Sequence, residues 1–210
     1  MVQMGEKLET KKDVLLIGIG STGMKTLLDM MSRKRSEIQC LAVDTEWEIL
    51  KEYGIWKRLL LGKNTTYGYP ALSIEEAIMA TMEEEKVLRC IFKKYSKIFV
   101  AFEIPKNNLT TIGILHVLGK IAREENVSIT GLFFQLEEEN GDTVEMVKEH
   151  LDEVILLCDK EHMIKNPSLE NKSSVISYQE LCDCFEWVMD DVLKVGKLIQ
   201  KANDIIEKYL

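Results

Sequence analysis

Three glycines, Gly18, Gly20 and Gly23, have the residue type and spacing that most directly suggest chemistry. They form a G-x-G-x-x-G pattern after an apolar run, and Ser21 and Thr22 lie inside it. Glycine lets the backbone turn tightly and approach a phosphate, whose charge is met by free N–H groups at the start of a helix. The pattern predicts a phosphate-binding loop. The alternative is a close strand-to-helix turn that holds no ligand.

Asp44 is the next candidate, because it closes a second apolar run and lies 21 residues after Gly23. A dinucleotide-binding fold places the acid that hydrogen-bonds the ribose at about this distance. An NAD-binding Rossmann protein is therefore one interpretation of the loop and the acid together. Against it, 210 residues leave little room for a separate substrate domain.

The elements that must position these residues follow an α/β pattern. Short apolar runs alternate with longer amphipathic stretches, as expected of parallel strands covered by helices on both faces. Strands are predicted over residues 14–19, 38–43, 97–102, 129–134 and 154–157, and helices over 22–33, 73–94, 110–125 and 143–151. Ligands of such a sheet bind at the carboxyl ends of the strands, where the strand order reverses.

The last part of the chain, residues 175–210, is predicted to form a long carboxyl-terminal helix. Its apolar residues recur at alternating steps of four and three, which places them on one stripe. They are Leu181, Phe185, Val188, Val192, Val195, Ile199, Ala202 and Ile206. The helix is expected either to pack on the core or to meet a partner, as in a coiled coil. Residues 1–210 are expected to form one domain, with no second domain.

Composition excludes several classes of protein. The chain is 46% apolar and has 27 basic against 35 acidic residues, a net charge of −8, which disfavours a nucleic-acid partner. No apolar run approaches the roughly 20 residues of a membrane span, and the amino-terminal sequence lacks the apolar core of a secretion signal. A cytoplasmic location is expected, with the five cysteines as reduced thiols.

Longer matches, in order along the chain, resemble the nucleotide-binding domain of the FtsZ/tubulin family. Residues 17–30, IGIGSTGMKTLLDM, are similar to its first strand, glycine loop and helix. Residues 42–50, AVDTEWEIL, resemble its AVNTDAQAL signature, and residues 61–71, LGKNTTYGYPA, resemble its IGEKLTRGLGA loop. Residues 149–157, EHLDEVILL, are similar to EHVDTLIVI, and residues 190–193, DDVL, resemble the start of the family's central helix.

The resemblance implies a three-layer, Rossmann-like α/β fold with a mainly parallel sheet. It also implies a cytoskeletal or cell-division relative that binds a guanine nucleotide, GTP or GDP, with Mg²⁺ as an accompanying ion. Lys25 and Asp159 match asparagines of the family's base pocket, Asp190 matches the acid that binds guanine, and Asn140 matches a loop near the ribose. The nucleotide-binding residues expected on this basis are Gly18, Gly20, Ser21, Thr22, Gly23, Lys25, Asp44, Thr66, Gly68, Asn107, Asn108, Thr110, Asn140, Asp159 and Asp190.

The second phosphate loop departs from the family. Where relatives have GMGGGTGTG, residues 105–113 read PKNNLTTIG, in which Thr110 is among the few residues kept. The lost glycines remove backbone freedom, and Pro105 has no N–H to donate. Because Asn107, Asn108, Thr110 and Thr111 are good helix N-cap residues and Lys106 supplies positive charge, this segment is expected either to help hold a ligand or only to cap the helix.

Two functions are therefore expected. The first is guanine-nucleotide binding by a protein that acts through protein–protein association, with little or no GTPase activity, because no counterpart of the family's catalytic loop precedes Leu210. The second is a nucleotide-free interaction module that dimerises, or docks on a full-length FtsZ/tubulin family member, through the carboxyl-terminal helix. No catalytic residue is named. No metal site is expected, since Cys182 and Cys184 on a helix would point in different directions.

Overall fold

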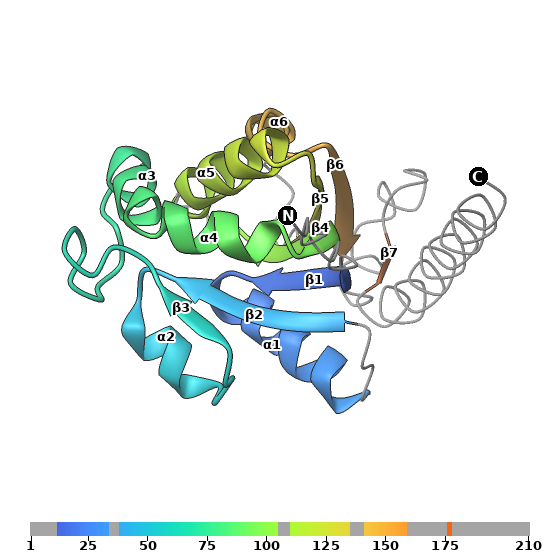
Figure 1. The fold of residues 1–210 in the computed structure, drawn as a ribbon, viewed down its shortest axis with the longest axis horizontal. Coiled ribbons are helices and arrows are strands. Elements are labelled where there is room, and N and C mark those ends of the chain that lie inside the picture. Colours follow the sequence, from blue (N-terminus) through green and yellow to red (C-terminus); the bar gives the residue numbers. More distant parts are fainter. Residues whose placement is uncertain (1–11, 34–37, 105–109, 135–140, 159–175, 178–210) are drawn as a thin grey trace, which may run out of the picture.

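The computed structural model describes residues 12–33, 38–104, 110–134, 141–158 and 176–177. These residues form a seven-stranded sheet in the order β3-β2-β1-β4-β5-β6-β7, and every neighbouring pair of strands is parallel (Figure 1). The strands are β1 (Lys12–Gly18), β2 (Ile38–Asp44), β3 (Arg58–Leu60), β4 (Tyr95–Glu103), β5 (Ser128–Phe134), β6 (Glu153–Cys158) and β7 (Ile176–Ser177). The strand order reverses between β1 and β4.

Six described helices cover the two faces of the sheet. They are α1 (Gly20–Ser32), α2 (Trp47–Glu52), α3 (Ile74–Glu83), α4 (Glu85–Phe92), α5 (Thr110–Glu124) and α6 (Gly141–Lys148). Figure 1 shows α1 and α2 on one side of the sheet and α3 to α6 on the other. The expected three-layer α/β architecture is confirmed.

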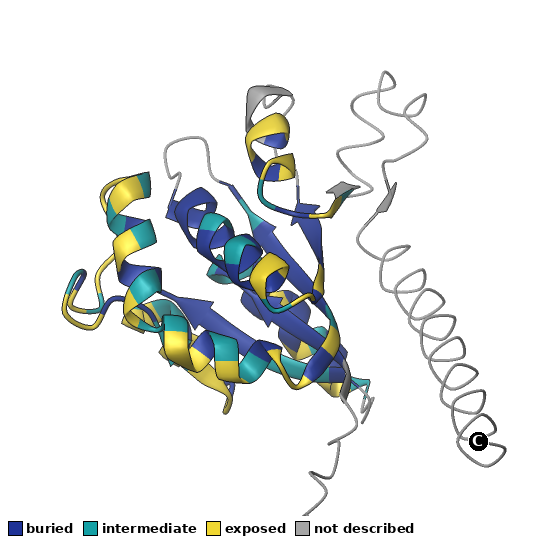
Figure 2. Cartoon of the chain, turned by 45° about the horizontal axis from the view of Figure 1, so that its top comes forward, coloured by how far each residue is buried: buried dark blue, intermediate teal, exposed yellow. Residues whose placement is uncertain are grey.

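Each face of the sheet has its own hydrophobic core. Alternate residues of β1 divide between them, so Leu15 and Ile17 pack toward α4 and α5, whereas Val14 and Leu16 pack toward α1. The central strands are buried on both sides, as the apolar runs predict (Figure 2). Most of α5 is buried as well, because α3, α4 and α6 pack around it.

The five predicted strands are confirmed to within two residues at either end, but the predicted helix over residues 73–94 is wrong. It divides at Glu84 into α3 and α4. Three consecutive glutamates, residues 83–85, stand at the division, and the backbone of Glu84 leaves the helical conformation with φ −100° and ψ 12°. The break lets Ala77 and Ala80 of α3 and Leu88 and Phe92 of α4 reach the core separately.

Three short elements, α2, β3 and β7, are not among the predicted ones. The strand β7 pairs with β6 at residues 176 and 177, so a helix beginning at residue 175 is excluded there. The remainder of the expected carboxyl-terminal helix, residues 178–210, lies outside the described residues. No helix of the described part is long and apolar enough to cross a membrane.

Candidate ligand site at the carboxyl ends of the strands

The glycine loop lies where the sequence places it, between the end of β1 and the start of α1. This is the point at which the strand order reverses, since β1 has β2 on one side and β4 on the other. Gly20 has a left-handed φ of 68° and begins α1. Ile19, at the N-cap, offers no side-chain hydrogen bond. The first N–H groups of α1 therefore have no side-chain cap from that position.

Two of the three glycines are required by packing. A Cβ on Gly18 would lie 2.6 Å from the carbonyl oxygen of Gly23, and a Cβ on Gly23 would lie 2.5 Å from the carbonyl oxygen of Ala101 in β4. At Gly20 no heavy atom lies within 4 Å of that position. Gly18 and Gly23 thus bring α1 close to the strands, as in the turn-only interpretation, and Gly20 alone faces open space.

Asp44 ends β2 and binds the glycine loop directly. Its Oδ2 accepts a hydrogen bond from the Gly20 N–H at 3.0 Å, and its Oδ1 accepts one from the Glu46 N–H at 2.9 Å. The side chain is buried, and burial raises the pKa of this carboxyl to about 6, against the lowering effect of the two N–H donors. Asp44 lies at the predicted position, but both of its oxygens already bind backbone of the same chain.

Glu103, at the end of β4, also contacts the loop and was missed by the sequence analysis. Its Oε2 accepts a hydrogen bond from the hydroxyl of Thr22. The sequence does show a single acid at the carboxyl end of an apolar strand. That acid can be assigned to the glycine loop only when β4 is known to lie beside β1. Two carboxylates, those of Asp44 and Glu103, therefore contact the first turn of α1.

A cavity of about 160 Å³ opens between these groups. Its lining consists of Ile19, Gly20, Ser21, Asp44, Thr45, Glu46, Ile49, Pro70, Glu103, Thr110, Thr111 and Ile114. Three of these residues carry carboxylates, and none of the described lining residues is Lys, Arg or His. The hydroxyl of Thr45 is buried without a hydrogen-bond partner in the described structure. The cavity is thus acidic, with a lining that mixes polar side chains and the apolar Ile19, Ile49, Pro70 and Ile114.

Of the predicted site residues, Gly20, Ser21, Asp44 and Thr110 line this cavity, as does Thr111, the other expected N-cap residue that the structure describes. The hydroxyl of Thr110 donates to the carbonyl of Ala71 at 3.0 Å, so it ties the start of α5 to the preceding loop. The sequence did not single out the other lining residues, which are Ile19, Thr45, Glu46, Ile49, Pro70, Glu103 and Ile114.

The other predicted residues that the structure describes have roles elsewhere. Lys25 is exposed on α1 and does not line the cavity. Thr66 is buried and its hydroxyl donates to the Gly62 carbonyl at 3.0 Å. Gly68 has a φ of 85°, and its carbonyl accepts the N–H of Trp47 at 2.9 Å. Predicted site residues Asn107, Asn108, Asn140, Asp159 and Asp190 lie outside the described residues.

The loop between β3 and α3 passes the cavity and carries large exposed side chains. Tyr67, Tyr69 and Leu72 are 76%, 71% and 92% exposed, and Pro70 between them lines the cavity. We call Tyr67, Tyr69 and Leu72 the aromatic rim. Large apolar side chains exposed on one short loop are candidates for a surface that contacts another molecule.

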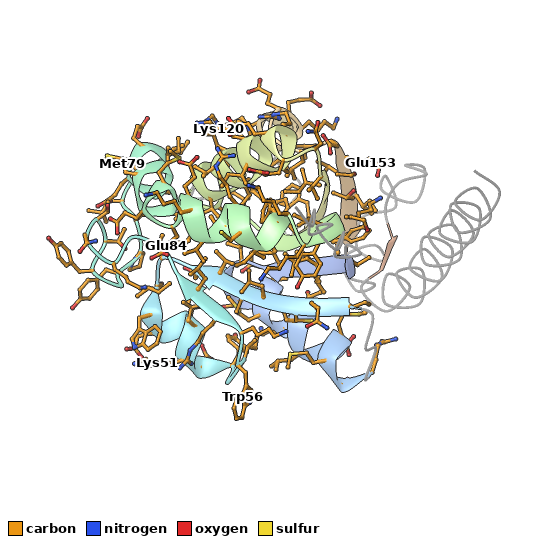
Figure 3. All side chains as sticks on the ribbon, in the orientation of Figure 1. Lys51, Trp56, Met79, Glu84, Lys120 and Glu153 are labelled. Carbon is orange, nitrogen blue, oxygen red and sulfur yellow. The ribbon has the colours of Figure 1, made fainter. Side chains whose placement is uncertain are left out.

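A second cavity, of about 280 Å³, lies at the opposite, amino-terminal end of β2. It is lined by Met30, Met31, Ile38, Gln39, Cys40, Ile55, Trp56 and Lys57. Trp56, at its edge, projects away from the sheet (Figure 3). None of the predicted site residues lines this cavity.

Phosphate groups do not fit the described lining of the acidic cavity. A nucleotide phosphate would meet the carboxylates of Asp44, Glu46 and Glu103 without a described cation to offset them. A bound metal ion commonly offsets the repulsion between carboxylates and a phosphate, but no three His, Cys, Asp or Glu side chains of the described residues are arranged to hold one. The volume is also below the roughly 300 to 1,000 Å³ of typical small-molecule sites.

No protein-family model and no curated protein sequence matches the chain. Solved structures do match. An empty FtsZ dimer from M. jannaschii matches at a TM-score of 0.63 and 16% identity, over 87% of this chain and 53% of that one. CetZ from Methanosaeta thermophila matches at a TM-score of 0.56 and 20% identity, over 82% of this chain and 53% of that one. TubZ of Clostridium botulinum phage c-st matches at a TM-score of 0.52 and 13% identity, over 76% of this chain and 59% of that one.

The chain therefore spans between half and three fifths of the length of these structures. Identities of this size establish the fold and leave the activity to be argued from the site. The strand order, the layers and these matches lead to one conclusion: the chain has an FtsZ/tubulin-like fold in a strongly divergent sequence.

Proposed function

We propose that this protein acts by associating with other proteins, with an FtsZ/tubulin-like fold whose ligand site no longer depends on a guanine nucleotide. One observation carries the proposal: the carboxylates of Asp44 and Glu103 contact the start of α1, where a phosphate would bind. The positive end of a helix dipole attracts an anion, and internal carboxylates already supply that charge. A phosphate added there would be repelled.

The aromatic rim supports the association itself. Tyrosine is enriched in the buried cores of protein interfaces, where it combines large area with a polar tip. Tyr69 and Leu72 are largely exposed in the isolated chain, so another surface could cover them without unfolding any element. A second copy of the chain and an FtsZ/tubulin family protein are the two partners we propose, in a cytoskeletal or cell-division setting.

Calorimetric titration tests whether the site is free of nucleotide. GTP and GDP, each with Mg²⁺, should produce no binding heat at millimolar concentration with the wild-type chain. The charge variant carries Glu46→Gln and Glu103→Gln, which remove two negative charges from the cavity lining and leave Asp44, whose two oxygens hold the loop, in place. If these acids exclude phosphate, that variant should bind at least tenfold more tightly than the wild type. Micromolar binding by the wild type would reject the proposal.

The second candidate function is guanine-nucleotide binding, favoured by the open position at Gly20 and by the lack of a side-chain cap from Ile19 at the N-cap of α1. Under this candidate the described acids would have to be offset by a cation when GTP or GDP enters. The same titration decides between the two. For both candidates we propose little or no GTPase activity, and measurement of phosphate released from GTP would check this directly.

A further inference from the structure

We infer that the contact between His116 and His150 is a pH-sensitive device, which holds α6 and the turn after it against α5 at neutral pH and lets them open when the rings take up protons. The inference goes beyond the proposed function and does not depend on it, because it concerns the attachment of α6 and not the acidic cavity. We call His116 and His150 the histidine pair.

The histidine pair joins two separate parts of the chain. His116 lies on α5, and His150 lies in the turn between α6 and β6. The ring centroids are 4.9 Å apart, and the ring planes are nearly perpendicular, at 86°. An edge-to-face contact of this kind is favourable between neutral aromatic rings. Neutral imidazoles therefore help to hold the turn on α5.

The backbone of the turn lies directly on α5 at the same place. A Cβ on Gly119 would lie 1.8 Å from the carbonyl oxygen of His150, so only glycine lets the two backbones come this close. The same oxygen accepts a long hydrogen bond of 3.5 Å from Nη1 of Arg123. A repulsion between the two rings thus acts directly on the contact between the turn and α5.

Charge makes this contact sensitive to protons. His150 is half-buried, and burial lowers the pKa of its imidazole below the ordinary 6.5. The positive charges of His116 and Arg123 on α5 lower that pKa further, whereas Glu149 acts in the opposite direction. The folded chain therefore disfavours the imidazolium form of His150, and a proton taken up there weakens the attachment.

The other carboxylates on the surrounding elements bind other groups. They are Glu124, Glu145, Asp152 and Glu153, which bind Arg89, Lys148, the Ile129 N–H and the Thr130 hydroxyl respectively. Lys120 adds a further positive charge to α5. Two protonated rings would thus meet with little compensation from neighbouring acids.

The helix α6 is held by few buried side chains. Of those that the structure describes, Val144 and Val147 are buried, and Glu145, Met146 and Lys148 are exposed (Figure 2). Elements with few buried contacts open locally before the rest of a protein unfolds. Protonation of the histidine pair is therefore expected to shift this local opening and to leave the sheet intact.

The direction of the effect follows from the lowered pKa of His150. The stability that its neutral form contributes is complete above the unfolded value of 6.5, and it is lost as the pH falls from there through the lower folded value. Asp44 acts with the opposite sign, because its folded pKa is raised. A local measurement separates the two groups.

Hydrogen exchange of the full chain at pH 7.5 and pH 5.5 tests the inference, after correction for the intrinsic pH dependence of exchange. Protection of residues 141–152 should fall by roughly threefold or more at pH 5.5. Protection of α4, which packs on α5 without contacting the histidine pair, should change by less than about twofold. Unchanged protection of residues 141–152, or an equal loss in α4, would overturn the inference.

Variants assign the effect to the histidine pair. His150→Phe keeps a ring without a titratable group and should remove the loss of protection at pH 5.5, and His116→Phe should reduce it. The control is His162→Phe, which alters the third histidine of the chain and should leave the loss as in the wild type. An effect of His162→Phe as large as that of His150→Phe would contradict the assignment.

A titration followed by NMR of the imidazole protons needs no stable His150 variant. In the wild type His150 should titrate below pH 6.5, and in His116→Phe its pKa should rise. A wild-type value at or above 6.5, or a value that does not respond to His116→Phe, would overturn the coupling between the two rings.

Discussion

At the scale of single residues, Asp44 connects the core to the candidate site. Its carboxylate is buried, yet it holds Gly20 and Glu46 by their N–H groups, so one side chain fixes both the glycine loop and the turn after β2. The same burial that makes these hydrogen bonds rigid also makes the charge costly, and this cost is what raises its pKa to about 6.

The pKa of Asp44 predicts a pH dependence that can be isolated by comparison with Asp44→Asn. The folded pKa of about 6 is above the ordinary 3.8, so the stability contributed by the protonated form is complete below 3.8 and is lost as the pH rises through 6. The free energy of unfolding of the wild type, relative to Asp44→Asn, should therefore fall by about 2 kcal/mol between pH 4 and pH 7. Urea unfolding across that range measures the difference, and a constant difference would contradict the prediction.

The packing around Gly20 and Gly23 predicts which of two alanine substitutions lowers the free energy of unfolding more. Gly23→Ala should lower the free energy of unfolding by about 3 kcal/mol or more, because its Cβ would collide with the backbone of β4. Gly20→Ala meets open space and should cost only about 1 to 2 kcal/mol, the strain of a left-handed alanine. Urea unfolding at one pH compares the two, and the reverse order would be inconsistent with the packing of α1 described above.

Sequence spacing could predict the place of Asp44 but not that of Glu103. The distance from Gly23 to the end of the next apolar run is local, so it identifies an acid beside the loop. Glu103 lies 80 residues beyond Gly23 along the chain and meets Thr22 only because β4 crosses back to lie next to β1. Part of the charge of the cavity depends on that crossing, and this is why the sequence pattern predicts a phosphate site without revealing the carboxylate of Glu103 beside it.

At the scale of elements, long strongly apolar runs were predictable and short or charged ones were not. Strands β1, β2, β4 and β5 are largely buried apolar runs and β6 is an apolar run at residues 154–158, whereas β3 has three residues and β7 has two. The helix pattern over 73–94 is continuous in apolar spacing, and only packing on α5 reveals that it serves two separate contacts. Tertiary packing decided where this helix divides.

The start of α3 provides a prediction at this scale. The Oγ of Ser73 accepts the N–H of Glu76 at 3.1 Å, and the Glu76 carboxylate in turn accepts the N–H of Leu72. Ser73→Ala removes the first of these bonds and should lower the free energy of unfolding by about 1 kcal/mol. Ser73→Thr keeps the acceptor and should restore most of that loss in the same urea measurement. An unchanged stability in Ser73→Ala would show that the cap contributes nothing.

At the scale of the whole molecule, the net charge of −8 and the acidic cavity have the same sign. Charges of one sign gathered in a cleft attract oppositely charged partners and speed their approach at low salt. Apolar side chains are exposed at both ends of the strands, by Tyr69 and Leu72 near the cavity and by Trp56 at the far end. The proposed function requires only the first of these surfaces.

Sedimentation velocity over a dilution series tests that requirement. The double variant Tyr69→Ser with Leu72→Ser should weaken self-association at least tenfold, because both side chains are largely exposed and serve no described core. Trp56→Ser is the control, since Trp56 is also 92% exposed but lies at the other end of the sheet. If Trp56→Ser alone abolishes association, the contact surface is at the wrong end for the proposal.

The close approach of Gly23 to the Ala101 carbonyl has a consequence for how any guest is selected. With backbone set directly against backbone, α1 packs closely on the strands beneath it, and close packing resists relative movement. The floor of the site is thus preorganised before anything enters, and little conformational entropy is lost there on binding. The preference for one ligand over another then arises from the charged side chains that line a rigid site. A few substitutions of these side chains could change that preference without changing the fold.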